Sequence, residues 1–298
     1  MSLSIVLAAL VWSHFYPNKP VLPDQVARQW HAWLLDSFNA GQRRQGVLAW
    51  GAGVLLPALA IGFLASLQAD ALAGMRWAFE VVVVYFVLGF REASFHAASI
   101  ARALHEEDIA RARDKLQAWR PGTLSCTDGE SITRLTVEET LKAALSSLLG
   151  VLFWYFLLGV AGVVAYRLAF LCRDLWHDQP EFDVFAVRAC EVLDWVPARV
   201  AAFSFAIVGN FQDALESWRG QAHAWGDENQ GVLLAAGAGA LGIGLGGGIN
   251  VAGGELLRPP LGLEDAPGPD SIDGAIALAW RAAMLWLAVV GLLWLGSL

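Results

Sequence analysis

The stretch from Ala143 to Tyr166 contains no Asp, Glu, Lys or Arg, and a cation flanks it on each side, Lys142 and Arg167. A helix of about 20 apolar residues is long enough to cross the ~30 Å hydrocarbon core of a bilayer. The alternative, a buried helix of a large soluble protein, is opposed by this length and by the cationic flanks. In the whole chain, 56% of the residues are hydrophobic and 16% are charged, against about a quarter charged in soluble domains. The sequence therefore predicts an integral membrane protein.

Other apolar segments extend this prediction to an all-α, polytopic helical membrane protein. We expect further membrane segments at 1–16, 47–67, 75–90 and 271–298, and leave 182–211 and 232–254 open. The N-terminal segment has neither a basic n-region nor a cleavage motif, so we interpret it as a short first membrane segment and not as a removed signal peptide. Residues 1–298 are predicted to form a single membrane domain.

The longest polar stretch, residues 91–140, is predicted to be a cytoplasmic helical loop inserted between membrane segments. Its alanine-rich runs predict two helices, Ala93–Leu104 and Asp108–Trp119. Its Arg and Lys residues place it on the cytoplasmic side by the positive-inside rule. The same rule places Arg28–Arg44 on that side, within segment 17–44, whose apolar spacing predicts an interfacial amphipathic helix.

Charge and cysteine content exclude several classes of function. The net charge of −8 argues against a nucleic-acid partner, because phosphate binding needs a basic surface. It also argues against a polybasic membrane anchor. The three cysteines are odd in number and lack CxxC spacing, so neither a disulfide framework nor a zinc site is indicated.

Two acidic features are candidates for a site. Glu80 falls within a predicted membrane segment, where a carboxylate faces either the interior of the bundle or, near the interface, water. Glu107 and Asp108, in the run 105–108, are candidate Mg²⁺ ligands. The alternative for that run, a solvated helix N-terminus with acids near the positive end of the dipole, is favoured. His96 and Arg102 fall on neighbouring turns and could join such a site.

Two glycine motifs match GxGxxG, at Gly237–Gly242 and Gly242–Gly247. A dinucleotide site requires a strand before the motif, a helix after it and an acid about 20 residues further on. The flanking segments do not predict that arrangement. Close packing of membrane helices through small residues is the favoured interpretation.

Residues 191–200, EVLDWVPARV, form the sharpest local motif. Pro197 is predicted to interrupt a helix there, as Pro57 is predicted to kink the segment 47–67. Asp194 and Arg199 are predicted to form an ion pair across the interruption.

LDWVPARV at 193–200 resembles the signature of the AmpE branch of the CobD/CbiB family of membrane proteins. Ala110–Arg113, Tyr166 with Arg167, and Ala240–Gly247 are similar to segments common to both branches. The resemblance runs in collinear order from Met75 to Leu298 and places the chain closer to the AmpE branch.

The resemblance implies a chemistry and also marks departures from it. CobD/CbiB proteins are implied to join aminopropanol or its phosphate to a corrinoid carboxylate, in an ATP- and Mg²⁺-dependent amide synthesis. Of the family's ETxxENxxDG motif only Glu139 and Thr140 are retained, and RPGTLSCT at 120–127 stands in place of VGRDT. The family's NTLD and SEA motifs are replaced by FLCR at 170–173 and LLA at 233–235.

These departures favour a non-catalytic, AmpE-like signalling modulator in the bacterial inner membrane, linked to cell-wall stress or β-lactamase induction. The alternative is a divergent, adenosylcobinamide-phosphate synthase-like ligase, which alone would need Mg²⁺ and ATP. Transport is a weaker third hypothesis. Expected partners are the lipid bilayer, a corrinoid or cell-wall-derived ligand, and a protein bound at the cytoplasmic helices. The candidate ligand-binding residues are Glu80, Lys115, Glu139, Asp194 and Arg199.

Overall fold

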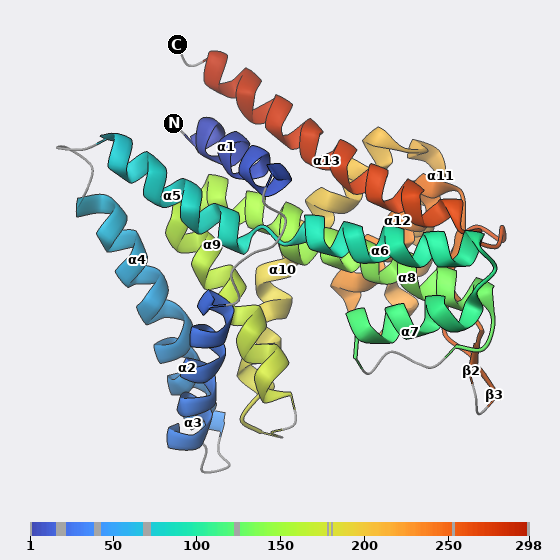
Figure 1. The fold of residues 1–298 in the computed structure, drawn as a ribbon, viewed down its shortest axis with the longest axis horizontal. Coiled ribbons are helices and arrows are strands. Elements are labelled where there is room, and N and C mark those ends of the chain that lie inside the picture. The colour runs from blue at the N-terminus through green and yellow to red at the C-terminus, as the bar shows by residue number, and fades with distance from the viewer. Residues whose placement is uncertain are drawn as a thin grey trace. The chain divides into compact units, whose positions relative to one another are not determined.

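The computed structural model describes residues 2–15, 22–38, 43–67, 73–121, 126–177, 179, 181–251 and 254–296. The chain is mostly helical, as predicted, with four short strands near its C-terminal end (Figure 1). It divides into two compact units. The first unit consists of Met1–Gly89 and Gly150–Val196, and the second of Phe90–Leu149 and Pro197–Leu298.

The first unit is a helical bundle in which α9 contacts α1, α2, α4 and α5. Its helices lie close to the predicted apolar and amphipathic segments. They are α1 (Ser2–Phe15), α2 (Leu22–Phe38), α3 (Arg43–Trp50), α4 (Leu56–Leu67), α5 (Ala73–Val87) and α9 (Gly150–Trp176), followed by the start of α10 (Val184–Val208).

Three helical segments of the described chain are long and apolar enough to cross a membrane: Arg43–Leu67, Gly129–Trp176 and Asp270–Leu295. They contain three of the predicted spans, including the central one. The other two predicted segments form shorter helices: 1–16 contains α1, of 14 residues, and 75–90 largely coincides with α5, of 15 residues. Both fall short of the roughly 20 residues needed to cross a bilayer. Spans at these two positions stay predictions.

The two prolines at which an irregular helix is predicted, Pro57 and Pro197, are accommodated differently by the backbone. A π-helical turn, η1 (Gly51–Leu55), precedes the first turn of α4, which contains Pro57, so the expected irregularity is a widened turn. The predicted interruption at Pro197 is wrong, because α10 continues through it. Proline lacks the N–H that would bond the carbonyl four residues earlier, and the Trp154 indole N–H donates to that carbonyl, of Leu193, at 3.3 Å.

The second unit surrounds α12 (Glu228–Leu241), which is buried along almost its whole length. This helix contacts α8 (Gly129–Ala144), α11 (Phe211–Gln221) and α13 (Asp270–Leu295). Its glycines permit that close packing, since a Cβ on Gly237 would strike Leu141 and one on Gly239 would strike the Asp213 backbone. The helix-packing interpretation of the first glycine motif therefore agrees with the structure.

The second glycine motif is not helical, which corrects the all-α prediction. Gly242 ends α12 in the left-handed conformation, at φ 71°. The chain then forms two antiparallel strand pairs, β1 (Gly244–Gly246) with β4 (Pro260–Gly262), and β2 (Ile249–Val251) with β3 (Gly254–Leu256). Glycine lowers helix propensity and allows the positive φ angles found at Gly246 and Gly247.

The predicted helices of segment 91–140 are confirmed as α6 (Phe90–His105) and α7 (Ile109–Trp119). These two helices and α8 lie side by side in the second unit (Figure 1). A π turn, η2 (Leu145–Leu149), joins α8 to α9, so the polar helix and the apolar span belong to one interrupted helix of 48 residues.

The backbone conformation of Gly159 yields a prediction about the stability of the first unit. Its φ of 65° and ψ of −152° kink α9, in a region that only glycine adopts readily. A Cβ there would meet open space, so Gly159→Ala should cost about 1–3 kcal/mol through conformation alone. Gly74, in α5, also faces open space but has a helical backbone. Gly74→Ala should therefore raise the free energy of unfolding by about 0.5–1 kcal/mol. Thermal unfolding in detergent checks both, and equal midpoints for the two variants would contradict this account.

Candidate functional site

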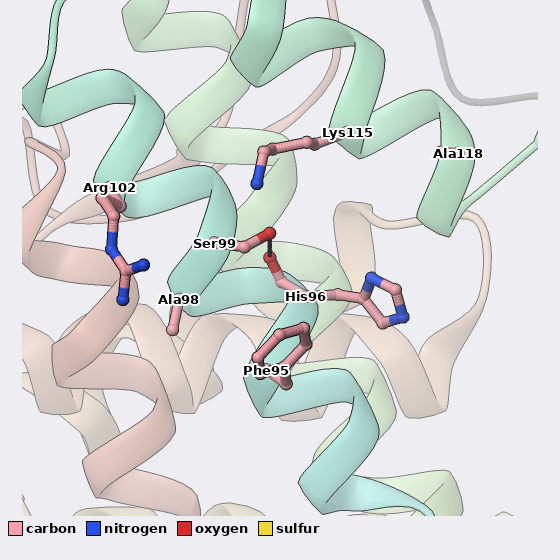
Figure 2. A pocket seen from close by; sticks show the side chains of 7 residues that line it. All are labelled: Phe95, His96, Ala98, Ser99, Arg102, Lys115 and Ala118. Carbon is pink, nitrogen blue, oxygen red and sulfur yellow. Dashed lines mark hydrogen bonds between the residues drawn. The ribbon is translucent and has the colours of Figure 1, made fainter. Parts of the chain in front are cut away.

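The second unit contains a pocket of about 380 Å³ between α6 and α7 (Figure 2). Arg102 from α6 and Lys115 from α7, one of the predicted site residues, extend toward the same space in Figure 2. The lining residues are Phe95, His96, Ala98, Ser99, Arg102, Lys115 and Ala118. Most of this wall is apolar, and its formal charges are both positive.

The acidic run between α6 and α7 forms the turn that brings these two helices together. Asp108 caps α7 by accepting a hydrogen bond from the Arg111 N–H at 3.0 Å, and Glu106 pairs with the Arg111 guanidinium at 3.0 Å. Glu107 takes a φ of 57° in the turn. This agrees with the helix N-terminus interpretation. The described residues hold no group of three or more His, Cys, Asp or Glu side chains placed to bind a metal ion, and Mg²⁺ at Glu107 and Asp108 stays a prediction.

Stacked rings and an ion pair connect the pocket to α8. His96 lies parallel to Trp119, with an interplanar angle of 9° and ring centroids 6.1 Å apart. The Arg120 guanidinium lies over the Trp119 ring at 5.2 Å and pairs with Glu139 at 3.2 Å. Glu139 also accepts a hydrogen bond from Lys142 at 2.9 Å. This predicted site residue is thus a carboxylate between two cations, and its side chain is 20% exposed.

The neighbouring Glu138, which the sequence did not single out, is more deeply buried, at 1% exposed. Its carboxylate accepts two hydrogen bonds from Arg258, at 2.7 and 2.9 Å, and a third from the Gly246 N–H at 3.0 Å. The Arg258 guanidinium lies over Trp225 at 5.6 Å. The pair is bidentate and both carboxylate oxygens are bonded, as a buried carboxylate requires. The Arg258 Nε, by contrast, is buried without a hydrogen-bond partner among the described residues.

Two further contacts join α8 to the glycine-rich strands. Arg134 donates to the Gly248 carbonyl at 2.6 Å, and the Ser131 hydroxyl accepts from the Asn250 N–H at 2.9 Å. Glu130, Arg134 and Glu138 follow each other at four-residue spacing. That alternation of charge along one face of a helix is the signal that could have identified them.

The remaining predicted site residues belong to different units. In the first unit, buried Glu80 accepts hydrogen bonds from Arg76 at 2.8 Å and Tyr155 at 2.9 Å, so it faces the interior of the bundle. Asp194, also in the first unit, accepts from the Tyr166 hydroxyl at 2.7 Å.

Arg199, in the second unit, bonds Asn229 at 3.0 Å and forms an ion pair with Glu228. The proposed Asp194–Arg199 pair stays a prediction.

Comparison with known proteins shows the family. The model of the CobD/CbiB protein family matches residues 6–279. A cobalamin biosynthesis protein CobD of Stutzerimonas stutzeri strain A1501 is 36% identical over 254 residues, covering 84% of this chain and 82% of that protein. A CobD of Chromobacterium violaceum is 34% identical over 70% of this chain and 68% of that protein. A cobalamin biosynthesis protein CbiB of Salmonella arizonae is 30% identical over 72% and 70%. No solved structure matches.

The chain therefore belongs to the CobD/CbiB family. The predicted AmpE-like signalling role is wrong, because relatives similar over most of the chain are named cobalamin biosynthesis proteins. The comparisons do not support placement in the AmpE branch either. The LDWVPAR motif and the lost polar motifs are short, and the overall similarity outweighs them.

The buried Glu138–Arg258 pair yields a stability prediction. Arg258→Met leaves a carboxylate that is 1% exposed without its cation, and such a loss costs about 3–5 kcal/mol. Replacing both partners, as in Glu138→Leu with Arg258→Met, should restore part of that loss. Arg43→Met is the matched control, because its pair with Glu181 is exposed and contributes about 0–1 kcal/mol. Denaturation in detergent measures all three, and equal losses for the two Arg→Met variants would count against the buried pair.

Cys126 yields a pH prediction. Burial, with a contribution from the Asp128 charge, raises the pKa of the Cys126 thiol from 9.0 to about 11. The folded state thus holds this proton more tightly than the unfolded state does. The protonated thiol therefore makes its full contribution to the free energy of unfolding below pH 9.0, and this contribution is lost as the pH rises toward 11. In a variant carrying Cys172→Ala and Cys190→Ala, the thiol should resist a disulfide reagent at about pH 8 until the protein is unfolded. Fast labelling of the folded variant would contradict the buried position.

Proposed function

We propose that this protein acts in cobalamin biosynthesis as an amide-forming ligase similar to adenosylcobinamide-phosphate synthase. It would join aminopropanol, or its phosphate, to a corrinoid carboxylate. The observation that carries the proposal is the similarity to a cobalamin biosynthesis protein CobD over 84% of this chain. Three apolar helices long enough to cross a bilayer support placement in a membrane, and we propose a multi-pass protein of the bacterial inner membrane.

The α8 network is the part of the structure that best suits this chemistry. Glu139, retained from the family motif, is partly exposed between Arg120 and Lys142. A carboxylate that is paired with cations can bind the ammonium group of an amino alcohol when that group takes the place of one of the two cations. Glu139 is therefore our first candidate for binding the amine, with the pocket between α6 and α7 beside it on the same unit.

The described side chains do not by themselves form a site for Mg²⁺ and a nucleotide. The described residues hold no group of three His, Cys, Asp or Glu ligands, and Mg²⁺ with a nucleotide is typically held by one or two carboxylates together with phosphates. The residues present do not make up a metal cage by themselves, and no metal-dependent step follows from them.

The test is amide formation by the purified protein in detergent, with a corrinoid acid, aminopropanol or its phosphate, ATP and Mg²⁺, followed by mass spectrometry of the product. We expect the amide product, and at least about a tenfold lower rate for Glu139→Gln, because a lost charge-assisted bond is of that order. Glu181→Gln, on an exposed pair in the first unit, is the matched control and should leave the rate unchanged. Corrinoid binding without product would overturn the ligase proposal, as would the absence of corrinoid binding.

A further inference from the structure

We propose that the pocket between α6 and α7 binds a phosphomonoester, a small anion attached to an apolar group. The inference is argued from the pocket's own charge and shape. It deepens the proposed function and rests on it, because aminopropanol phosphate is a phosphomonoester; anion binding and amide formation are measured separately, so either can fail alone.

The charge of the pocket is the first argument. Arg102 and Lys115 line it, and none of its described lining residues is acidic, although the chain as a whole carries a net charge of −8. Within the described part of the chain, neither cation forms an ion pair or a side-chain hydrogen bond. Two cations brought to one space without a counterion repel each other, and an anion between them removes that cost.

The other cations of α7 differ from Lys115 in their acidic neighbours. Arg111 and Arg113 belong to the same helix as Lys115, and each has an acidic neighbour, Glu106 at 3.0 Å and Asp114 at 3.8 Å. Among the three cations of α7, Lys115 lines the pocket, and it is the cation that has no described acidic partner.

The size and the wall of the pocket define the class of ligand. Pockets of about 300–1,000 Å³ bind small organic molecules, and the 380 Å³ here exceeds what a bare phosphate needs. Phe95, 73% exposed, with Ala98 and Ala118, offers apolar surface to the rest of the ligand. A fork of guanidinium donors and an ammonium group together suit the oxygens of a phosphate.

Two of the α6 residues that line the pocket, His96 and Ser99, are held in place by contacts within the protein. His96 is stacked on Trp119, and the Ser99 hydroxyl donates to the His96 carbonyl at 2.8 Å (Figure 2). Side chains that are already ordered lose less entropy on binding.

The experiment uses the full-length protein in detergent, with phenyl phosphate and inorganic phosphate as calorimetric probes. We expect saturable binding of phenyl phosphate, competition by inorganic phosphate, and tighter binding of the probe that has the apolar ring. Arg102→Gln and Lys115→Gln should each weaken binding by about tenfold. Arg113→Gln removes the same charge from the same helix outside the pocket and should leave the affinity unchanged.

A lipid headgroup offers the same phosphate chemistry, so a second arm compares nanodiscs of phosphatidylcholine with and without phosphatidic acid. Retention of phosphatidic acid by the wild type, and its loss in Arg102→Gln and Lys115→Gln, would identify the headgroup as the natural anion and support the site. Thermal unfolding confirms that each variant is folded. The proposal is overturned if neither probe binds saturably and phosphatidic acid is not retained, or if Arg113→Gln weakens binding as much as the pocket variants.

Discussion

A helix in apolar surroundings must find hydrogen-bond partners for its backbone N–H and C=O groups within the protein, and much of this structure follows from that constraint. Proline leaves a carbonyl without its intrahelical donor, yet α10 continues through Pro197 because the Trp154 indole bonds the Leu193 carbonyl. Before Pro57 the helix widens into a π turn. In both places the helix persists because the backbone finds a different partner or spacing.

Polar groups determine the architecture of the second unit in a different way. Glu138 and Arg258, 120 residues apart, form a buried pair that holds the glycine-rich strands against α8. On a partly exposed face of the same helix, Glu139 lies between two cations, and the helices packed beside it carry the cationic pocket. On α8, then, the buried charge is paired with the strand segment, and the partly exposed charge is paired with cations of the neighbouring helical segments.

Loss of the family's short polar motifs does not by itself exclude the family's chemistry. Apolar residues at positions where the family carries polar ones argued against the family's chemistry, but they do not reveal which other side chains replace the lost groups. Arg258 and Arg134 contribute charge near Glu138 and the strands through long-range contacts that short motifs do not contain. Similarity over most of the chain does not depend on any single short motif and is the stronger indication.

The sequence alone determined the helical class, the apolar spans and the two helices before the central span, because hydrophobic length and periodicity are local properties. It also identified Lys115 and Glu139 as candidates. The tertiary structure decided the rest: that the second glycine motif forms strands, that Glu138 is buried against Arg258, and that Arg102 joins Lys115 in one pocket. These features depend on which distant segments meet, and the pattern of residues along one helix does not specify its partners.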